Sequence, residues 1–219
     1  MPTSSSLEES VSVGPAGIWD AETIAGVAAT TFPLACPPGA GSEDIAAFVE
    51  ETLSAENFSE YLTDPRRIVL KACVDDEIVG YLMAVDPASE TTVDPASENS
   101  VDPASQNSVD PASENSVDPA SQNSDAYAVP DVVTARPAIE ISKLYVLPGH
   151  HGAGVSAALM DAIVERAAER RRAGLWLGVN QENTRARRFY QKHGFEVVGT
   201  RTFVVGSQTH DDFLMQRVL

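Results

Sequence analysis

One stretch of this chain, from Ile139 to Ala157, limits the possible folds more than any other. It reads IEISKLYVLPGHHGAGVSA. The β-branched and aromatic residues of its first half predict a strand over 139–147. Three glycines then follow within six residues, and an apolar pattern with helical spacing begins at Val155. A helix that starts after such a loop presents backbone N–H groups without intrahelical partners, and its dipole is positive at this end. The stretch therefore predicts a phosphate site.

Strand and helix patterns alternate on both sides of this stretch. Apolar runs predict strands over residues 11–18, 67–74, 77–85, 139–147, 175–179, 195–205 and 213–218. Helical spacing predicts helices over residues 20–29, 42–53, 57–62, 155–172 and 183–193, with a proline-rich loop from residue 33. Asp75 and Asp76 are expected to join two of the strands as a hairpin. The order predicts an α/β or α+β domain, with a mixed sheet and helices on both faces.

Five tandem octapeptides occupy residues 85–124. They read VDPASETT, VDPASENS, VDPASQNS, VDPASENS and VDPASQNS, with Val as the only sizeable apolar side chain per unit. No helix or strand continues through this proline period, and so little apolar surface does not offset the ordering entropy. We therefore predict a disordered insertion; a calcium-binding or adhesive array is the alternative. With a flexible N-terminus at residues 1–10, the rest is predicted to be one domain, 11–219, interrupted by the insertion.

The charge distribution differs between the two halves of the chain. The formal net charge is −17, yet only three of the 15 Lys and Arg residues precede residue 136. An anionic ligand is therefore expected in the C-terminal half, whereas a chain this acidic is a poor candidate for nucleic-acid binding. The N-terminus has no basic and apolar signal segment, and no uncharged apolar run approaches about 18 residues. These features predict a cytoplasmic protein without a membrane partner.

The glycine loop alone does not identify its ligand. No Lys-Ser or Lys-Thr pair follows it, as an NTPase P-loop requires, and no acidic residue about 20 positions later fits a dinucleotide ribose. A second segment, residues 183–195, adds information. It reads NTRARRFYQKHGF, and one helix face collects Ala186, Phe189, Tyr190 and His193. Gly194 suits the left-handed position that ends a helix before a strand.

Together, the two segments resemble the GNAT superfamily of acetyl-CoA-dependent N-acetyltransferases. The second segment matches the family motif N-x-x-A-x-x-F-Y-x-x-x-G-F at every specified position. The loop resembles the pyrophosphate motif Q/R-x-x-G-x-G/A, with His151 in place of Gln or Arg and Ser156 in place of Gly or Ala. A histidine still donates a hydrogen bond, and a serine is small enough for close backbone approach. The resemblance implies a mixed, mostly antiparallel sheet and acetyl-CoA as the acyl donor.

The resemblance also implies which residues bind acetyl-CoA. Backbone groups of Leu144, Tyr145 and Val146 would pair with the pantetheine arm as a neighbouring strand does. The loop residues would hold the pyrophosphate, largely through backbone N–H groups; they are His151, Gly152, Ala153, Gly154, Val155, Ser156 and Ala157. Asn183 would hydrogen-bond the cofactor or serve as a helix N-cap. Arg185, Arg187 and Arg188 form a solvated helix face, or one of them meets the 3′-phosphate.

Two residues are implied in the chemistry itself. Tyr190 would be the general acid that protonates the departing CoA thiolate, and Glu140 would be the base that deprotonates the amine directly or through water. A strand N–H would stabilise the tetrahedral oxyanion. The structural alternatives are a core tyrosine and a solvated strand glutamate. We expect no metal site, although His150 and His151 are adjacent.

A narrower resemblance concerns the acceptor. The Thr31-Phe32-Pro33 segment and the chain from residue 175 onward are similar to a bacterial subgroup that includes spermine/spermidine N-acetyltransferases. With the acidic N-terminal half, this similarity predicts a small cationic amine or polyamine, which Asp211 and Asp212 could attract. A protein N-terminus or lysine is the alternative acceptor, and a non-catalytic acetyl-CoA-binding or interaction protein is the alternative function. Either a monomer or a homodimer is expected.

Overall fold

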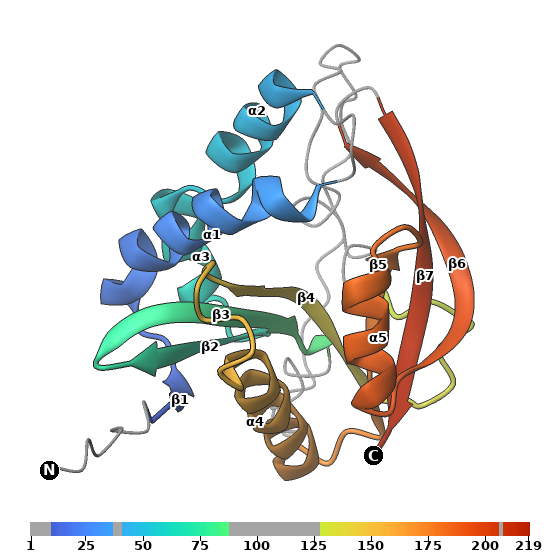
Figure 1. The fold of residues 1–219 in the computed structure, drawn as a ribbon. Helices are drawn as coiled ribbons and strands as arrows, with labels where there is room; N and C mark the ends of the chain where they lie inside the picture. Colours follow the sequence, from blue (N-terminus) through green and yellow to red (C-terminus); the bar gives the residue numbers. More distant parts are fainter. Residues whose placement is uncertain (1–9, 37–40, 88–127, 206–207) are drawn as a thin grey trace, which may run out of the picture.

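The fold is a single seven-stranded sheet with helices on both faces (Figure 1). The computed structural model describes residues 10–36, 41–87, 128–205 and 208–219. The strands are β1 (Ser12–Pro15), β2 (Arg67–Val74), β3 (Glu77–Val85), β4 (Ala138–Val146), β5 (Gly174–Asn180), β6 (Glu196–Val205) and β7 (Gln208–Val218). The helices are η1 (Ile18–Asp20), α1 (Ala21–Ala35), α2 (Ser42–Thr52), α3 (Ala55–Thr63), α4 (Val155–Glu169) and α5 (Thr184–Lys192). The predicted fold class, a mixed and mostly antiparallel sheet between helices, is confirmed.

The two faces of the sheet bury separate apolar clusters. On one face, α1 and α3 pack on β2, β3 and β4 around Ile24, Phe58 and Tyr81. On the other face, α4 lies across β1 to β5, and its Leu159 and Ile163 are fully buried. Figure 1 shows α1 and α4 on opposite sides of β3 and β4. None of the helices in the described part of the chain is long and apolar enough to cross a membrane.

The predicted hairpin between β2 and β3 is confirmed. Its two turn residues, Asp75 and Asp76, have φ angles of 51° and 65°. Both are therefore in the left-handed region, as a two-residue turn of type I′ requires, and aspartate tolerates that region better than most residues. The hairpin pairs β3 with β2, and β4 pairs with the other edge of β3, with Tyr81 opposite Tyr145 and Leu82 opposite Leu144.

The sheet splits open between its two parallel strands, β4 and β5. They pair only through Ala138 with Gly174, Ile139 with Leu175, and Glu140 with Trp176. Beyond Glu140 and Trp176, β4 continues to Val146 and β5 to Asn180 without pairing to each other. The strand order is β1-β2-β3-β4-β5-β7-β6, so this separation lies in the interior of the sheet.

A β-bulge in β4 lies just beyond the last paired position. Met83 of β3 is opposite Lys143, while the next residue, Ala84, is opposite Ile141, so Ser142 is the additional residue. One extra residue reverses the alternation of side chains along a strand. As a result, Ile141 and Leu144 both face the α4 side, where they join the same apolar cluster.

Three predicted boundaries are wrong. Helix α1 does not end near residue 29 but continues through Pro33 to Ala35. Pro33 costs the helix the one hydrogen bond that its own nitrogen would donate to the carbonyl of Ala29, and the remaining bonds carry the helix to Ala35. Helix α4 ends at Glu169 instead of residue 172 because Arg171 has a left-handed φ of 54°. Strand β7 begins at Gln208 rather than residue 213, because β6 pairs with it along its length.

The predicted start of the insertion, residue 85, is also wrong. Val85 is the last residue of β3, and the carboxylate of Asp86 is fully buried. Asp86 Oδ2 accepts hydrogen bonds from Arg170 Nη1 at 3.1 Å and from Arg172 Nη2 at 3.0 Å. The first repeat therefore contributes its valine and aspartate to the folded domain. Residues 88–124 of the predicted disordered insertion, and residues 1–9 of the predicted flexible N-terminus, lie outside the described residues.

Replacing Asp86 by alanine should strongly destabilise the domain. The change leaves the guanidinium groups of Arg170 and Arg172, which are 37% and 16% exposed, without their carboxylate. Because water reaches both, the expected loss is about 2–3 kcal/mol, below the value for a fully buried pair. Urea unfolding measures the loss. The control is Glu169→Ala, which removes an exposed ion pair to Arg166 (3.5 Å), where a change within about 0.5 kcal/mol is expected. Equal, small effects of the two variants would contradict a structural role for Asp86.

Candidate active site

A cavity of about 900 Å³ opens where β4 and β5 separate. We call it the splay cavity. Its walls come from β4 from Glu140 onward, β5 from Trp176 onward, the glycine loop before α4, helix α5, and the C-terminal end of α1 together with α2. One residue each from β2, β3, β6 and β7 completes the lining, with Ala128 and Pro130. The cavity therefore connects the two faces of the sheet, and groups from either face can meet inside it.

The glycine loop folds so that the start of α4 opens into the cavity. Gly149, Gly152 and Gly154 have φ angles of 95°, 92° and 82°, a region that residues with a Cβ rarely adopt. Gly154 is the N-cap, no side chain caps it, and the first helical bond runs from Ala158 N to its carbonyl oxygen at 2.8 Å. The N–H groups of the first helical turn are thus left for a ligand. No described atom lies within 4 Å of the point where a Cβ at Gly152 or Gly154 would be, so a phosphate has room to approach.

Basic side chains surround this helix start. His151 and Arg185 both line the splay cavity. Burial, and then the positive charges of Arg185 and His150, lower the pKa of His151 below its usual range. A neighbouring positive field has this effect because it opposes a second cation. The same field favours an anion, which supports the predicted phosphate site without defining the ligand.

The edge of β4 forms a second wall of the cavity. Leu144, Tyr145 and Val146 pair with β3 on one side, while their other side faces the separation from β5. Strand backbones alternate the direction of their N–H and C=O groups, so part of this edge has no strand partner. An extended ligand could pair with it as an added strand would.

Helix α5 supplies Asn183 and Tyr190 to the cavity. Asn183 caps the helix, because its Oδ1 accepts from Ala186 N at 3.0 Å. Its amide nitrogen donates to none of the described residues. Tyr190 packs edge-on against Phe189 and Phe195, with ring centroids 5.4 and 5.8 Å away. Burial raises the pKa of Tyr190 to about 12, so its phenol stays protonated at neutral pH.

Glu140 belongs to a charged group on the α1 side of the sheet. Its Oε1 lies 3.9 Å from Arg201 Nη1, and Arg201 Nε lies 3.6 Å from Asp212 Oδ2. Arg201 reaches this position across Gly178, whose missing side chain leaves the space that the guanidinium fills. All four residues line the cavity. One arginine from β6 therefore holds two carboxylates from β4 and β7 at the cavity floor.

Most of the predicted site residues come together in the splay cavity. Its lining includes both predicted catalytic residues and every predicted cofactor residue except Ala153. The N–H of Ala153 instead donates to His150 O at 3.4 Å within the loop. Asp212 lines the cavity, while Asp211 does not.

Among the arginines of α5, only Arg185 reaches the cavity. Arg187 lies 4.7 Å from the ring of Phe213 and donates to Gln181 O at 2.9 Å. Its place in the fold is therefore structural, and the exposed Arg188 is also outside the cavity lining.

Sequence reasoning missed several residues of the α1 side of the cavity. They are Phe48, Arg67, Lys143, Trp176, Gly178 and Arg201. No local motif marks them, since they come from separate strands and helices that only the sheet register brings together. Phe32 was noticed within a segment of family likeness, but its position in the cavity wall was not predicted.

Comparison with known proteins is consistent with this geometry. The family model described as the acetyltransferase (GNAT) family matches residues 40–195. The chain is 40% identical over 200 residues to an uncharacterized N-acetyltransferase of Mycobacterium tuberculosis. This alignment covers 91% of this chain and 98% of that protein. Two solved structures share the fold. One is the PaiA N-acetyltransferase of Thermoplasma acidophilum in complex with coenzyme A (TM-score 0.64, 16% identity, 96% and 99% of the two chains). The other is the ribosomal-protein-S18-alanine N-acetyltransferase of Escherichia coli (TM-score 0.58, 12% identity, 95% and 94%).

The left-handed N-cap of α4 can be tested by one substitution made at two glycines. Gly154→Ala should lower the free energy of unfolding by about 1–2 kcal/mol, because a Cβ disfavours a positive φ. Gly26→Ala, on the exposed surface of α1 with no described atom within 4 Å of the new Cβ, should raise it by about 0.5–1 kcal/mol. Chemical denaturation of both variants gives the sign of each change. The same sign at both positions would contradict the assigned conformation of Gly154.

Proposed function

The chain belongs to the acetyltransferase (GNAT) family, and from this premise we propose that it transfers the acetyl group of acetyl-CoA to a small amine in the splay cavity. One observation carries the proposal. The uncapped start of α4, the unpaired edge of β4 and the protonated phenol of Tyr190 all line the same cavity. A phosphate, an extended arm and a leaving thiolate each require one of these groups.

The cofactor-binding residues fit acetyl-CoA by the kinds of group they offer. The first-turn N–H groups of α4 and the side chains of His151 and Arg185 suit the phosphates. The backbone from Leu144 to Val146 suits the amide-rich pantetheine arm, and the amide nitrogen of Asn183 can donate to it. Acetyl-CoA, when bound, supplies the activated thioester on which an amine acts.

In the proposed chemistry, one residue of the cavity accepts a proton from the amine and another donates a proton to the departing thiolate. Glu140 takes the proton that the amine loses, directly or through a water molecule. An N–H of β4 at the bulge stabilises the oxyanion that forms as the amine nitrogen attacks the carbonyl carbon. When the C–S bond breaks, Tyr190 donates its proton to the thiolate. The proton gained by Glu140 and the proton lost by Tyr190 balance over the cycle.

The ion pair with Arg201 defines how Glu140 can act. The guanidinium of Arg201 lies 3.9 Å from its carboxylate. The carboxylate of Glu140 attracts the incoming ammonium group and holds it nearby. Glu140 can then accept the proton that the amine loses. Arg201 thus orients Glu140 through charge, while Asp212 holds Arg201 in turn at 3.6 Å.

The proposed acceptor is a small amine that arrives as an ammonium ion. Glu140 and Asp212 provide two carboxylates on the α1 side of the cavity. Likeness of the Thr31-Phe32-Pro33 segment to the spermine/spermidine subgroup is the reason to include a polyamine among the acceptors to test. A protein N-terminus or a lysine side chain is the second candidate, supported by the shared fold of the ribosomal-protein-S18-alanine enzyme alone.

The proposed function predicts release of free thiol when the protein is incubated with acetyl-CoA and a panel of amines. The panel should contain spermidine, short alkylamines, arylalkylamines and a peptide with a free N-terminus. Thiol release above the rate without amine, together with saturable acetyl-CoA binding by calorimetry, is the expected result. No release with any amine would overturn the proposed transfer, and no acetyl-CoA binding would also overturn the assignment of the cavity.

Tyr190→Phe should lower kcat by about 10²-fold or more, because it removes the general acid. The affinity for acetyl-CoA should stay within about twofold, since the phenol is not placed among the cofactor-binding groups. Undiminished turnover would remove Tyr190 from the proton transfer.

The same tyrosine predicts an unusual pH profile. It acts in its protonated form, and burial raises its pKa from 10.0 to about 12. The protonated fraction therefore stays near one as the pH rises from about 8 to 10, whereas an ordinary phenol would be half ionised at about pH 10. We expect kcat of the wild-type protein not to fall over this range. A decline with a midpoint near pH 10 would contradict either the role of Tyr190 or its burial.

A further inference from the structure

The α1 side of the splay cavity has an apolar wall. Six residues form it, and we call them the α1–α2 wall: Thr31, Phe32, Leu34, Ala35, Cys36 and Phe48. The rings of Phe32 and Phe48 stack with centroids 4.6 Å apart and an angle of 12° between their planes. Because one ring comes from α1 and the other from α2, the stack presents a broad aromatic surface where the two helices meet.

The two polar residues of the α1–α2 wall do not make it polar. The hydroxyl of Thr31 donates to Val27 O at 2.7 Å, within its own helix. The thiol of Cys36 likewise donates to Phe32 O at 3.3 Å, and burial raises its pKa, which keeps it neutral. Their hydrogen-bonding groups are therefore directed at the helix backbone. The wall carries no charge and favours an apolar ligand surface.

The cavity floor, across from the α1–α2 wall, carries charges of both signs. Among the described lining residues on this side, Glu140 and Asp212 are acidic, while Arg67, Lys143 and Arg201 are basic. Both carboxylates lie beside the same guanidinium, that of Arg201, at 3.9 and 3.6 Å. Arg201 offsets the charge of one of the two carboxylates, so this group attracts one ammonium group rather than several.

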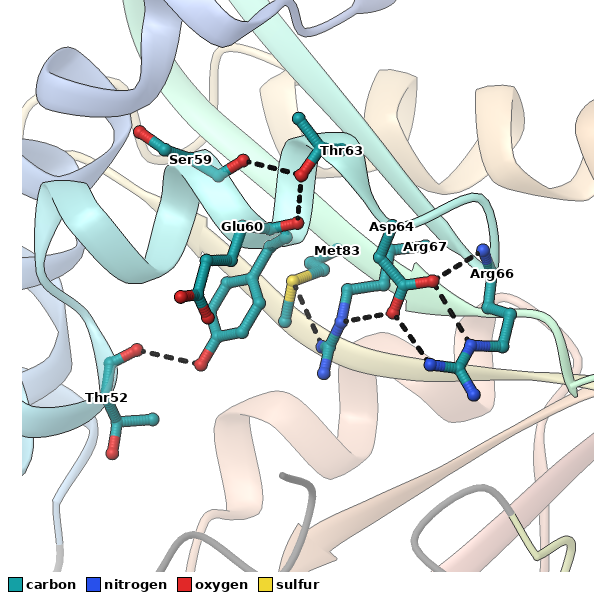
Figure 2. Close-up of polar contacts among 9 residues, drawn as sticks. Thr52, Ser59, Glu60, Thr63, Asp64, Arg66, Arg67 and Met83 are labelled. Carbon is teal, nitrogen blue, oxygen red and sulfur yellow. Dashed lines mark hydrogen bonds and ion pairs between the residues drawn. The ribbon is translucent and has the colours of Figure 1, made fainter. Parts of the chain in front are cut away.

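Arg67 and Lys143 keep the other end of this floor basic. Only 5% of the Arg67 side chain is exposed, and its guanidinium lies 4.3 Å from the ring of Tyr61. Figure 2 shows Arg67 between Asp64 and Met83, with Arg66 sharing the same aspartate. Lys143 Nζ lies 5.9 Å from the ring of Tyr61. Both cations therefore have partners of their own, and among the described lining residues this end of the floor offers no carboxylate for a second ammonium group.

We infer that the acceptor is an amine with a single ammonium group and a flat apolar body that packs against Phe32 and Phe48. This inference rests on the proposed function and specifies its substrate class. The ammonium group lies towards Glu140, and the apolar body lies against the α1–α2 wall. Arylalkylamines have this chemistry, while polyamines carry too many charges and short alkylamines carry too little apolar surface.

The kinetic test compares 2-phenylethylamine, n-propylamine and spermidine as acceptors with the full-length protein. Thiol release should give 2-phenylethylamine a kcat/KM at least about tenfold above that of either other amine. Phe48→Ala should lower kcat/KM for 2-phenylethylamine by about tenfold, mainly through KM, because one ring of the aromatic surface is lost. The same variant should change the value for n-propylamine by less than about twofold.

Two controls separate recognition from folding. Phe48→Leu retains an apolar side chain and should give an intermediate kcat/KM for 2-phenylethylamine. Trp19→Ala removes a tryptophan that is 89% exposed and lies outside the cavity lining, so all three amines should react as with the wild type. Unchanged acetyl-CoA affinity and thermal midpoint show that each variant is folded.

Each contrary outcome has a different meaning. A higher kcat/KM for spermidine than for 2-phenylethylamine would overturn this inference and leave the proposed function intact. An equal loss for all three amines in Phe48→Ala would also overturn it, because the ring would then act on the site as a whole. No thiol release with any amine, despite acetyl-CoA binding, would overturn the proposed function and this inference with it.

Discussion

The parting of β4 from β5 after Glu140 and Trp176 is the constraint on which the rest of the site depends. Two parallel strands in the interior of a sheet would normally pair along their whole length, because an unpaired buried backbone group costs about 1–3 kcal/mol. Here the pairing stops after three residue pairs, and a cavity of about 900 Å³ replaces it. A ligand that supplies hydrogen bonds to the edge of β4 therefore restores pairing that the fold itself leaves out.

Several features keep the two strands apart. The bulge at Ser142 bends β4 just beyond the last pair, and bulges of this kind increase the local twist of a strand. On the other side, β5 is held by complete antiparallel pairing with β7 from Gly174 to Asn180. The guanidinium of Arg201 then occupies the space over Gly178. Each strand is thus tied to its outer neighbour, and the opening persists without a ligand.

The end of β3 shows how the domain tolerates a long insertion next to its central strands. Asp86 anchors the chain to Arg170 and Arg172 at the C-terminal end of α4, immediately before the repeats continue. Val85 pairs with Glu140, so the anchor lies beside the position where β4 and β5 part. The ion pairs therefore fix the end of β3 beside Glu140.

The parts of the site that sequence alone placed in the cavity are mostly those that a local motif marks. A glycine loop before a helix, or the motif from Asn183 to Phe195, is local, so spacing and residue type are sufficient to detect it. The hairpin turn at Asp75 and Asp76 was predictable for the same reason.

The charged group of Glu140, Arg201 and Asp212 has no such local signature. It depends on the register of β6 against β7 and of β7 against β5, and a shift by one residue would place each side chain on the opposite face. Pro33 misled in another way, because proline usually ends or kinks a helix, whereas α1 continues through it to Ala35.

Some site residues were predictable from sequence and others were not, and this difference follows from how the two substrates would be recognised. The cofactor side uses backbone N–H groups and a helix terminus, which demand glycines at fixed positions and leave little freedom to the sequence. The acceptor side uses side chains from α1, α2 and four strands, so the floor or the α1–α2 wall can change without disturbing the glycine loop. Phe32 and Phe48 stack on each other at the border of the core cluster on the α1 side of the sheet, so substitution there is expected to alter the apolar surface of the wall. Under the proposed function, acceptor choice is therefore expected to vary among proteins that retain the same cofactor site, with the side chains of the wall determining it.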